Sequence, residues 1–186
     1  NLLFYRRRQL RCLLLRQPRA QLIHVVGINR GRQIVRTLAQ TPALHRVFDF
    51  AAETGLVAIL HNDIDMPFPK PGQDPYQIVQ LYELFRRHPK TTIIWAHMGL
   101  GRIVHPVKDM AGLIERLLQN PELSHVYIDI SWDEVAKYVL ETREVTQRTA
   151  ELIDAFPDRF LFGTDNVAPH DRETHLAIYR SYEPLW

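Results

Sequence analysis

Three strings of the sequence place a histidine or a carboxylate within three residues of the end of a run of apolar, β-type residues. His61 follows the run 56–60, His97 follows 92–96, and Asp165 follows 160–162 after Gly163 and Thr164. Imidazole nitrogen and carboxylate oxygen both bind zinc at about 2.0–2.2 Å, and both transfer protons. These three side chains could therefore form a metal site that includes an acid–base group.

The spacing of the three strings fits a repeating strand–helix unit. His61 and His97 are 36 residues apart, and His97 and Asp165 are 68 apart, or two intervals of 34. A strand with its return helix needs about 30 residues or more. A further strand end is therefore expected near residue 131, where the string 126–131 lies. Parallel α/β proteins carry their chemistry where strands end, so these ends are expected to meet.

The apolar periodicity predicts a parallel α/β fold, because strands alternate with helices. Gly55 is expected to end one helix and Asp171 to cap another, and the proline-rich residues 61–75 are expected to form a loop. Residues 22–28 fit a strand or a helix equally well. The predicted strands are 56–60, 92–96, 126–130 and 160–162, and the predicted helices are 1–17, 33–40, 42–53, 76–87, 106–119, 133–140, 145–156 and 172–182.

The composition bounds the class of protein. The 186 residues suit a single domain or part of a larger one, with 46% hydrophobic and 24% charged residues. No apolar run approaches the ~20 residues that a membrane helix needs. Cys12 is the single cysteine, which excludes an internal disulfide and a cysteine-rich zinc site. These features predict a cytoplasmic protein that acts without a membrane.

The N-terminal part of the chain is strongly basic. Ten arginines precede the first carboxylate, Asp49, although the net charge is only +2. We divide the chain into a basic segment, 1–30, and a body, 31–186. A transit peptide or a nucleic-acid surface could be basic in this way, but the stretch lacks serines, interleaved aromatic residues and an RNA-binding motif. A solvated helix face is the favoured interpretation, and nucleic acid is an unlikely partner.

Each candidate site residue also has a structural interpretation. A histidine could be a buried, hydrogen-bonded core residue, and Asp165 could cap the helix that follows it. The common position of His61, His97 and Asp165 at strand ends favours a functional role for all three. His105 and His170 in loops, together with Trp132, are candidate substrate contacts. Asp63, Asp65 and Asp129 are weaker candidates.

These strings carry a resemblance to a known family. His61, the string Trp95-Ala96-His97-Met98-Gly99 and the string Phe162-Gly163-Thr164-Asp165 resemble the ends of strands five, six and eight of the amidohydrolase superfamily. The nearest likeness, over about residues 45–183, is to the branch of aminocarboxymuconate-semialdehyde decarboxylase-like metal-dependent hydrolases.

The resemblance implies roles for individual residues. His61 would be a metal ligand, His97 the catalytic histidine, and Asp165 a metal-linked carboxylate and proton shuttle. A divalent metal, zinc first and manganese second, would activate a water against a carbonyl-type small-molecule substrate, such as an amide or a lactone. The implied fold is a (β/α) barrel of TIM type.

One feature of the family pattern is missing from the sequence. The first strand of the family normally supplies His-x-His, and none of the nine histidines forms such a pair. A complete barrel takes about 250 residues, and only 60 precede His61. We therefore expect an incomplete barrel that contains strands five to eight. Its exposed strand edge would favour a homo-oligomer.

The functional hypotheses fall into different classes. The leading one is a metal-dependent hydrolase, and a carboxy-lyase could use the same metal site. A catalytically inactive barrel fragment that acts as a binding or structural module is the alternative that the missing His-x-His motivates. An open, doubly wound nucleotide-binding sheet is supported only by Gly99-Leu100-Gly101, which lacks the third glycine of that motif.

Overall fold

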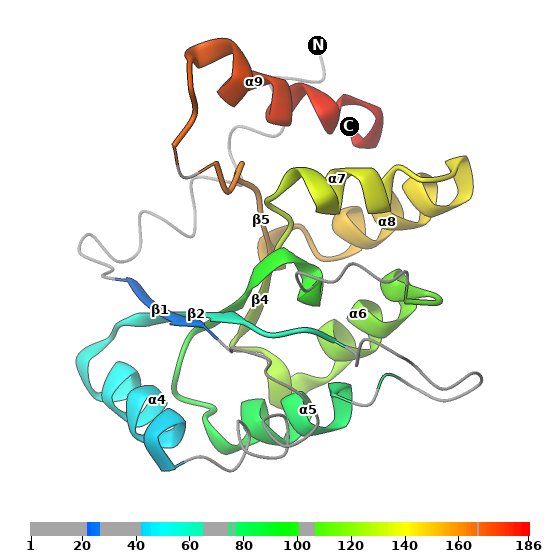
Figure 1. Ribbon diagram of the computed structural model, residues 1–186. Coiled ribbons are helices and arrows are strands. Elements are labelled where there is room, and N and C mark those ends of the chain that lie inside the picture. The colour runs from blue at the N-terminus through cyan, green and yellow to red at the C-terminus, as the bar shows by residue number, and fades with distance from the viewer. Residues whose placement is uncertain (1–21, 27–41, 65–74, 76, 101–106, 167) are drawn as a thin grey trace.

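A parallel β-sheet forms the centre of the chain (Figure 1). The structure is a computed structural model that describes residues 22–26, 42–64, 75, 77–100, 107–166 and 168–186. In these residues the sheet has five strands in the order β1-β2-β3-β4-β5, and each neighbouring pair is parallel. The strands are β1 (Leu22–Val26), β2 (Val57–His61), β3 (Ile93–Trp95), β4 (Val126–Asp129) and β5 (Phe160–Leu161).

The strand order separates two of the predicted architectures. An open, doubly wound sheet reverses its order at a switch point, whereas a (β/α) barrel adds its strands one after another. The described strands follow the sequential order with no reversal. The parallel α/β class is thus confirmed, and the order disfavours the doubly wound nucleotide-binding sheet. Barrel closure and the assignment of the strands as five to eight stay predictions.

The helices form an arc in chain order, from α4 in cyan to α9 in red (Figure 1). They are α4 (Pro42–Thr54), α5 (Ile78–Arg87), α6 (Met110–Gln119), α7 (Asp133–Val139), α8 (Arg143–Ala155) and α9 (Arg172–Ser181). Four short 3₁₀ turns join the described elements: η1 (Ala96–Gly99), η2 (Pro121–Leu123), η3 (Pro157–Arg159) and η4 (Glu183–Leu185). Residues 22–28, which fitted two interpretations, contain the strand β1.

Local signals explain where several helices begin and end. The side chain of Asp171 accepts a hydrogen bond from the Thr174 amide and caps α9, as predicted. Gly55 ends α4 with a φ of 73°, which a glycine adopts at little cost. Helix α6 begins at Met110 rather than 106, because Asp109 caps it from a left-handed conformation. Helix α8 begins two residues earlier than predicted, because Thr142 caps it.

Some predictions fall on residues whose structure is not described. These are the helices 1–17 and 33–40, most of the loop 61–75, and the boundary between the segments 1–30 and 31–186. In the described part of the chain, no helix is both long enough and apolar enough to cross a membrane.

The core lies between the sheet and the helices. Strand side chains that do not enter this core lie on the opposite face of the sheet. In β4, Val126 and Ile128 are fully buried, whereas Tyr127 and Asp129 are half-buried. Because side chains alternate along a strand, Asp129 lies on the face opposite Ile128. Trp95 is also fully buried, and its indole Nε1 donates to the Asn62 carbonyl at 2.9 Å. This bond ties the end of β3 to the end of β2.

Away from these strand ends, two histidines and a carboxylate join α4 to the end of α5. His88 Nδ1 lies 3.2 Å from Asp49 Oδ1, and its Nε2 lies 2.6 Å from His45 Nδ1. Burial lowers the pKa of His88 below its ordinary value of 6.5. The charges of His45 and Arg87 lower it further, while Asp49 opposes the change. The folded chain therefore holds His88 neutral at pH values where the unfolded chain protonates it.

We expect the chain to lose stability as the pH falls below about 6.5, because unfolding then takes up a proton at His88. Urea denaturation at about pH 7.5 and about pH 5.5 would measure the loss. His88→Gln should show a shallower decline, whereas His170→Gln, which changes an exposed histidine, should keep the decline of the wild type. Burial also lowers the pKa of His125, so part of the decline should remain. An unchanged decline in His88→Gln would contradict the assignment.

Candidate active site

The backbone is strained where the predicted site residues lie. His97 and Met98 have φ values of 57° and 54°, and Gly99 follows with 78°. A left-handed conformation costs a residue with a side chain roughly 1–2 kcal/mol. Five non-glycine residues of the described chain have positive φ, and His97, Trp132 and Asp165 are three of them. Strained backbone persists where the surroundings hold it, and it gathers at functional sites.

Asp129, at the end of β4, holds the backbone at His97. Its Oδ2 accepts the amide N–H of His97 at 3.2 Å and the hydroxyl of Ser131 at 2.6 Å. Its Oδ1 accepts the amide N–H of Ser131 at 3.1 Å. A single carboxylate thus fixes the turn after β3 against the segment after β4.

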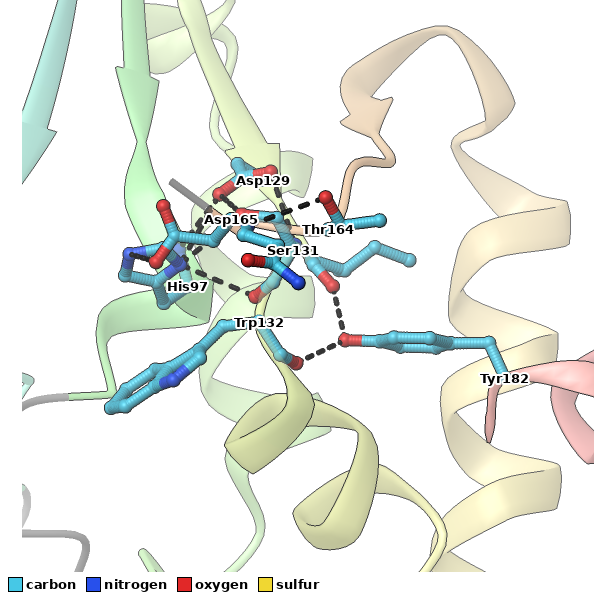
Figure 2. Close-up of polar contacts among 9 residues, drawn as sticks. His97, Asp129, Ser131, Trp132, Thr164, Asp165 and Tyr182 are labelled. Carbon is cyan, nitrogen blue, oxygen red and sulfur yellow. Dashed lines mark hydrogen bonds and ion pairs between the residues drawn. The ribbon is translucent and has the colours of Figure 1, made fainter. Parts of the chain in front are cut away.

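The surroundings of His97 Nδ1 assign its proton (Figure 2). Nδ1 lies 3.2 Å from the carbonyl oxygen of Ser131, 3.3 Å from the Ser131 hydroxyl oxygen and 3.5 Å from Asp129 Oδ2. The Ser131 hydroxyl gives its proton to Asp129, so all three oxygens can only accept from Nδ1. Nδ1 therefore carries the proton, and Nε2 of the neutral imidazole has a free lone pair.

Nε2 of His97 faces Asp165. The distance from Nε2 to Asp165 Oδ2 is 3.6 Å, and the Asp165 side chain is 39% exposed. Both atoms carry lone pairs in the neutral imidazole and the carboxylate, so a proton or a cation between them would relieve their repulsion. His61 approaches from the end of β2, with its ring 4.9 Å from that of His97 at 62°. The structure thus brings His61, His97 and Asp165 together.

Aromatic and hydroxyl side chains complete this end of the sheet. The Trp132 ring packs against His97 with centroids 5.2 Å apart. Thr164 is buried, and its hydroxyl accepts the Asn166 amide at 3.3 Å and lies 3.5 Å from His175 Nδ1. These contacts support the turn at Asp165 from α9.

The other predicted contacts are not placed at this cluster. His105 and Asp65 lie outside the described residues, and His170 is exposed in the segment before α9.

Asp129, a weaker candidate, lies at the centre of the hydrogen bonds. Ser131 was not a candidate, although the alternation of 126–131 puts its side chain on the same face as Asp129. Tyr182, which follows α9, had no signal in the sequence.

The side chains of His61, His97 and Asp165 offer the types of donor atom that divalent metals bind. Imidazole nitrogen and carboxylate oxygen are zinc ligands, and an open catalytic zinc site has three protein ligands. The free lone pairs of His97 Nε2 and Asp165 face each other beside His61. In the residues that the structure describes, no group of three histidine, cysteine, aspartate or glutamate side chains stands close enough to hold an ion. The cluster therefore fits a metal in the chemistry of its donor atoms, but among the described residues these side chains do not stand close enough together to form a complete ligand set.

The chain matches the Amidohydrolase family over residues 13–181 and belongs to that family. This match agrees with the resemblance at the strand ends. A comparison with the curated proteins gave no match. The narrower decarboxylase-like branch stays a prediction.

Solved structures of amidohydrolases are similar to the chain. An amidohydrolase from Burkholderia multivorans with bound zinc is 17% identical, with a TM-score of 0.51 over 88% of this chain and 57% of that one. This likeness supports the shared fold alone. Amidohydrolase 2 from Bifidobacterium longum subsp. infantis is 19% identical, with a TM-score of 0.46 over 81% and 52% of the two chains.

A probable 2-pyrone-4,6-dicarboxylic acid hydrolase from Acinetobacter baumannii, with citric acid bound, is also similar. It is 14% identical, with a TM-score of 0.48 over 89% of this chain and 57% of that one. This chain thus matches a little over half the length of each of these three proteins.

Proposed function

We propose that this chain contributes His61, His97 and Asp165 to the active site of a metal-dependent hydrolase. The substrate would be a small molecule with a carbonyl-type electrophile, such as an amide or a lactone. The observation that carries the proposal is the 3.6 Å approach of His97 Nε2 to Asp165 Oδ2 beside the ring of His61. Family membership supports the hydrolytic class.

The residues would divide the chemistry among them. His61 and Asp165 would hold the metal, zinc or manganese, and a bound divalent ion would supply Lewis acidity that makes a water more acidic and polarises a carbonyl. Asp165 would accept the proton that the attacking water loses. His97 would offer the lone pair of Nε2 to a proton of the substrate, because its Nδ1 proton is already engaged.

The walls of the site would bind and orient the substrate. Trp132 packs against His97 and would give an apolar surface against which the substrate could lie. His105 and His170 are proposed as further substrate contacts. A cytoplasmic location and a homo-oligomeric state stay predictions from the sequence.

The test is the metal content of the purified chain. Elemental analysis followed by titration with zinc and manganese should show about one bound equivalent in the wild type. His61→Ala and Asp165→Ala should each lose it, because each removes a donor atom. Asp158→Ala, which removes an exposed carboxylate in η3, is the matched control and should bind as the wild type does.

Two results would contradict the proposal. One is a folded wild-type chain that binds neither metal, which would favour the non-catalytic module. The other is metal binding that persists unchanged in both His61→Ala and Asp165→Ala, which would place the ligands elsewhere. Circular dichroism of each variant would show that lost binding reflects lost ligands rather than unfolding.

A further inference from the structure

A buried tyrosine from the C-terminal end of the chain contacts the backbone behind His97. Tyr182 follows α9 and has no exposed surface. Its hydroxyl lies 2.8 Å from the carbonyl oxygen of Trp132 and also contacts the carbonyl oxygen of Ile130, so the two carbonyls share its single proton. Figure 2 shows the phenol of Tyr182 approaching the carbonyl of Trp132 from the side opposite His97. A hydroxyl from 50 residues away thus joins the two residues that flank Ser131.

The carbonyl of Ser131 lies between the two that Tyr182 contacts and faces the other way. It accepts from His97 Nδ1 at 3.2 Å. Because each peptide unit is planar, holding the carbonyls of residues 130 and 132 limits the rotation of the peptide unit between them, and this keeps the carbonyl of residue 131 toward His97. The φ of Trp132 is 92°, a strained conformation that needs such an external contact to persist.

We propose that Tyr182 is a positioning residue for His97: by holding the carbonyls of Ile130 and Trp132, it aims the Ser131 carbonyl at Nδ1 and keeps the free lone pair on Nε2. The inference rests on the proposed function only in naming His97 as the catalytic histidine. The hydrogen bond to one ring nitrogen selects the tautomer and so determines which nitrogen is available for chemistry.

The environment of Tyr182 suits this role. Burial and the nearby charges of Asp129 and Asp133 raise the pKa of its phenol far above the ordinary range. The hydroxyl therefore keeps its proton at neutral pH and can donate it. Phe162 packs edge-on against the ring of Tyr182, with centroids 4.8 Å apart. This contact holds the phenol in one position, from which its hydroxyl donates.

The experiment determines the tautomer of His97 by long-range ¹H–¹⁵N correlation of the imidazole rings. The full chain is measured at about pH 8, where an ordinary imidazole is neutral, with a chelator present so that no metal occupies Nε2. His97→Gln assigns the signals by their disappearance. We expect the wild type to carry the proton on Nδ1. Protonation of the wild-type ring on Nε2 would overturn the proposal.

Tyr182→Phe removes the hydroxyl and keeps the ring. We expect a several-fold rise in the fraction of His97 that is protonated on Nε2. Tyr82→Phe is the matched control, because it deletes a tyrosine-to-carbonyl hydrogen bond, from Tyr82 to Leu113 at 3.2 Å, between α5 and α6. It should keep the tautomer of the wild type. A folded Tyr182→Phe chain with an unchanged tautomer would overturn the proposal.

Ser131→Ala tests whether the main-chain carbonyl of Ser131, rather than its hydroxyl, selects the tautomer of His97. This test does not depend on whether Tyr182→Phe folds. Ser131→Ala removes the hydroxyl near Nδ1 and leaves the main-chain carbonyl, so the proton should stay on Nδ1. A change of tautomer here would show that the hydroxyl selects it, which would overturn the role of the carbonyl. None of these spectra needs a metal or a substrate, so a failure of the hydrolase proposal would be seen separately, in the metal titration.

Discussion

Gly99→Ala is expected to lower the free energy of unfolding by about 3 kcal/mol or more, because overpacking and a left-handed backbone add their costs. An added Cβ would lie within 3.0 Å of three carbons of the Trp95 indole, and the φ of Gly99 is +78°. The indole cannot easily move, since it is fully buried and bonded to Asn62. Urea denaturation followed by circular dichroism would measure the loss.

Gly55→Ala provides a matched control for this prediction. The φ of Gly55 is +73°, but no atom lies within 4 Å of the Cβ that would be added. It carries the conformational cost alone, about 1 kcal/mol. Equal losses in the two variants would show that contact with Trp95 adds nothing. A larger loss in Gly99→Ala would show that close packing on Trp95 holds the turn that carries His97.

The sequence predicted the features that depend on regular strand–helix spacing or on neighbouring residues. His61, His97 and Asp165 were expected to meet because each follows an apolar run at a strand–helix interval, and His97 lies against both His61 and Asp165. Asp171 was expected to cap α9 because a cap is a local interaction, and its side chain does accept from Thr174. The first prediction rests on the regular spacing of strand–helix units, and the second rests on residues close together in the sequence.

The features that the sequence did not predict depend on contacts between distant residues. The residue type alone does not predict a left-handed conformation at His97, because histidine adopts this conformation more often than most residues but still only in a small minority of positions. The surroundings that hold His97 in it include Asp129, which is 32 residues away. The role of Tyr182 depends on a hydrogen bond across 50 residues, and the sequence predicted only a helix for residues 172–182.

The hydrogen bonds at Asp129 lead to the second large expected effect, a loss of about 2–3 kcal/mol of unfolding free energy in Asp129→Asn. The carboxylate accepts from two amides and one hydroxyl, all in a largely buried setting with 16% of its side chain exposed. An asparagine would turn an NH₂ group toward one of these donors. At least one N–H would then lose its partner, and such a loss is costly when the group is buried. Urea denaturation would measure the stability, and hydrogen exchange of the His97 and Ser131 amides would locate the damage.

Asp133→Asn distinguishes this effect from a general loss of negative charge. Asp133 is four residues further on, is 51% exposed, and contacts Lys137 at 3.7 Å, so its change should cost less than about 1 kcal/mol. Faster exchange at His97 and Ser131 should appear in Asp129→Asn alone, because those two amides donate to Asp129. A loss below 1 kcal/mol in Asp129→Asn, or unchanged exchange at both amides, would mean that other contacts hold the turn. If the prediction holds, a single carboxylate on β4 maintains the strained backbone from which His97 faces Asp165, and stability and site geometry at this end of the sheet depend on the same hydrogen bonds.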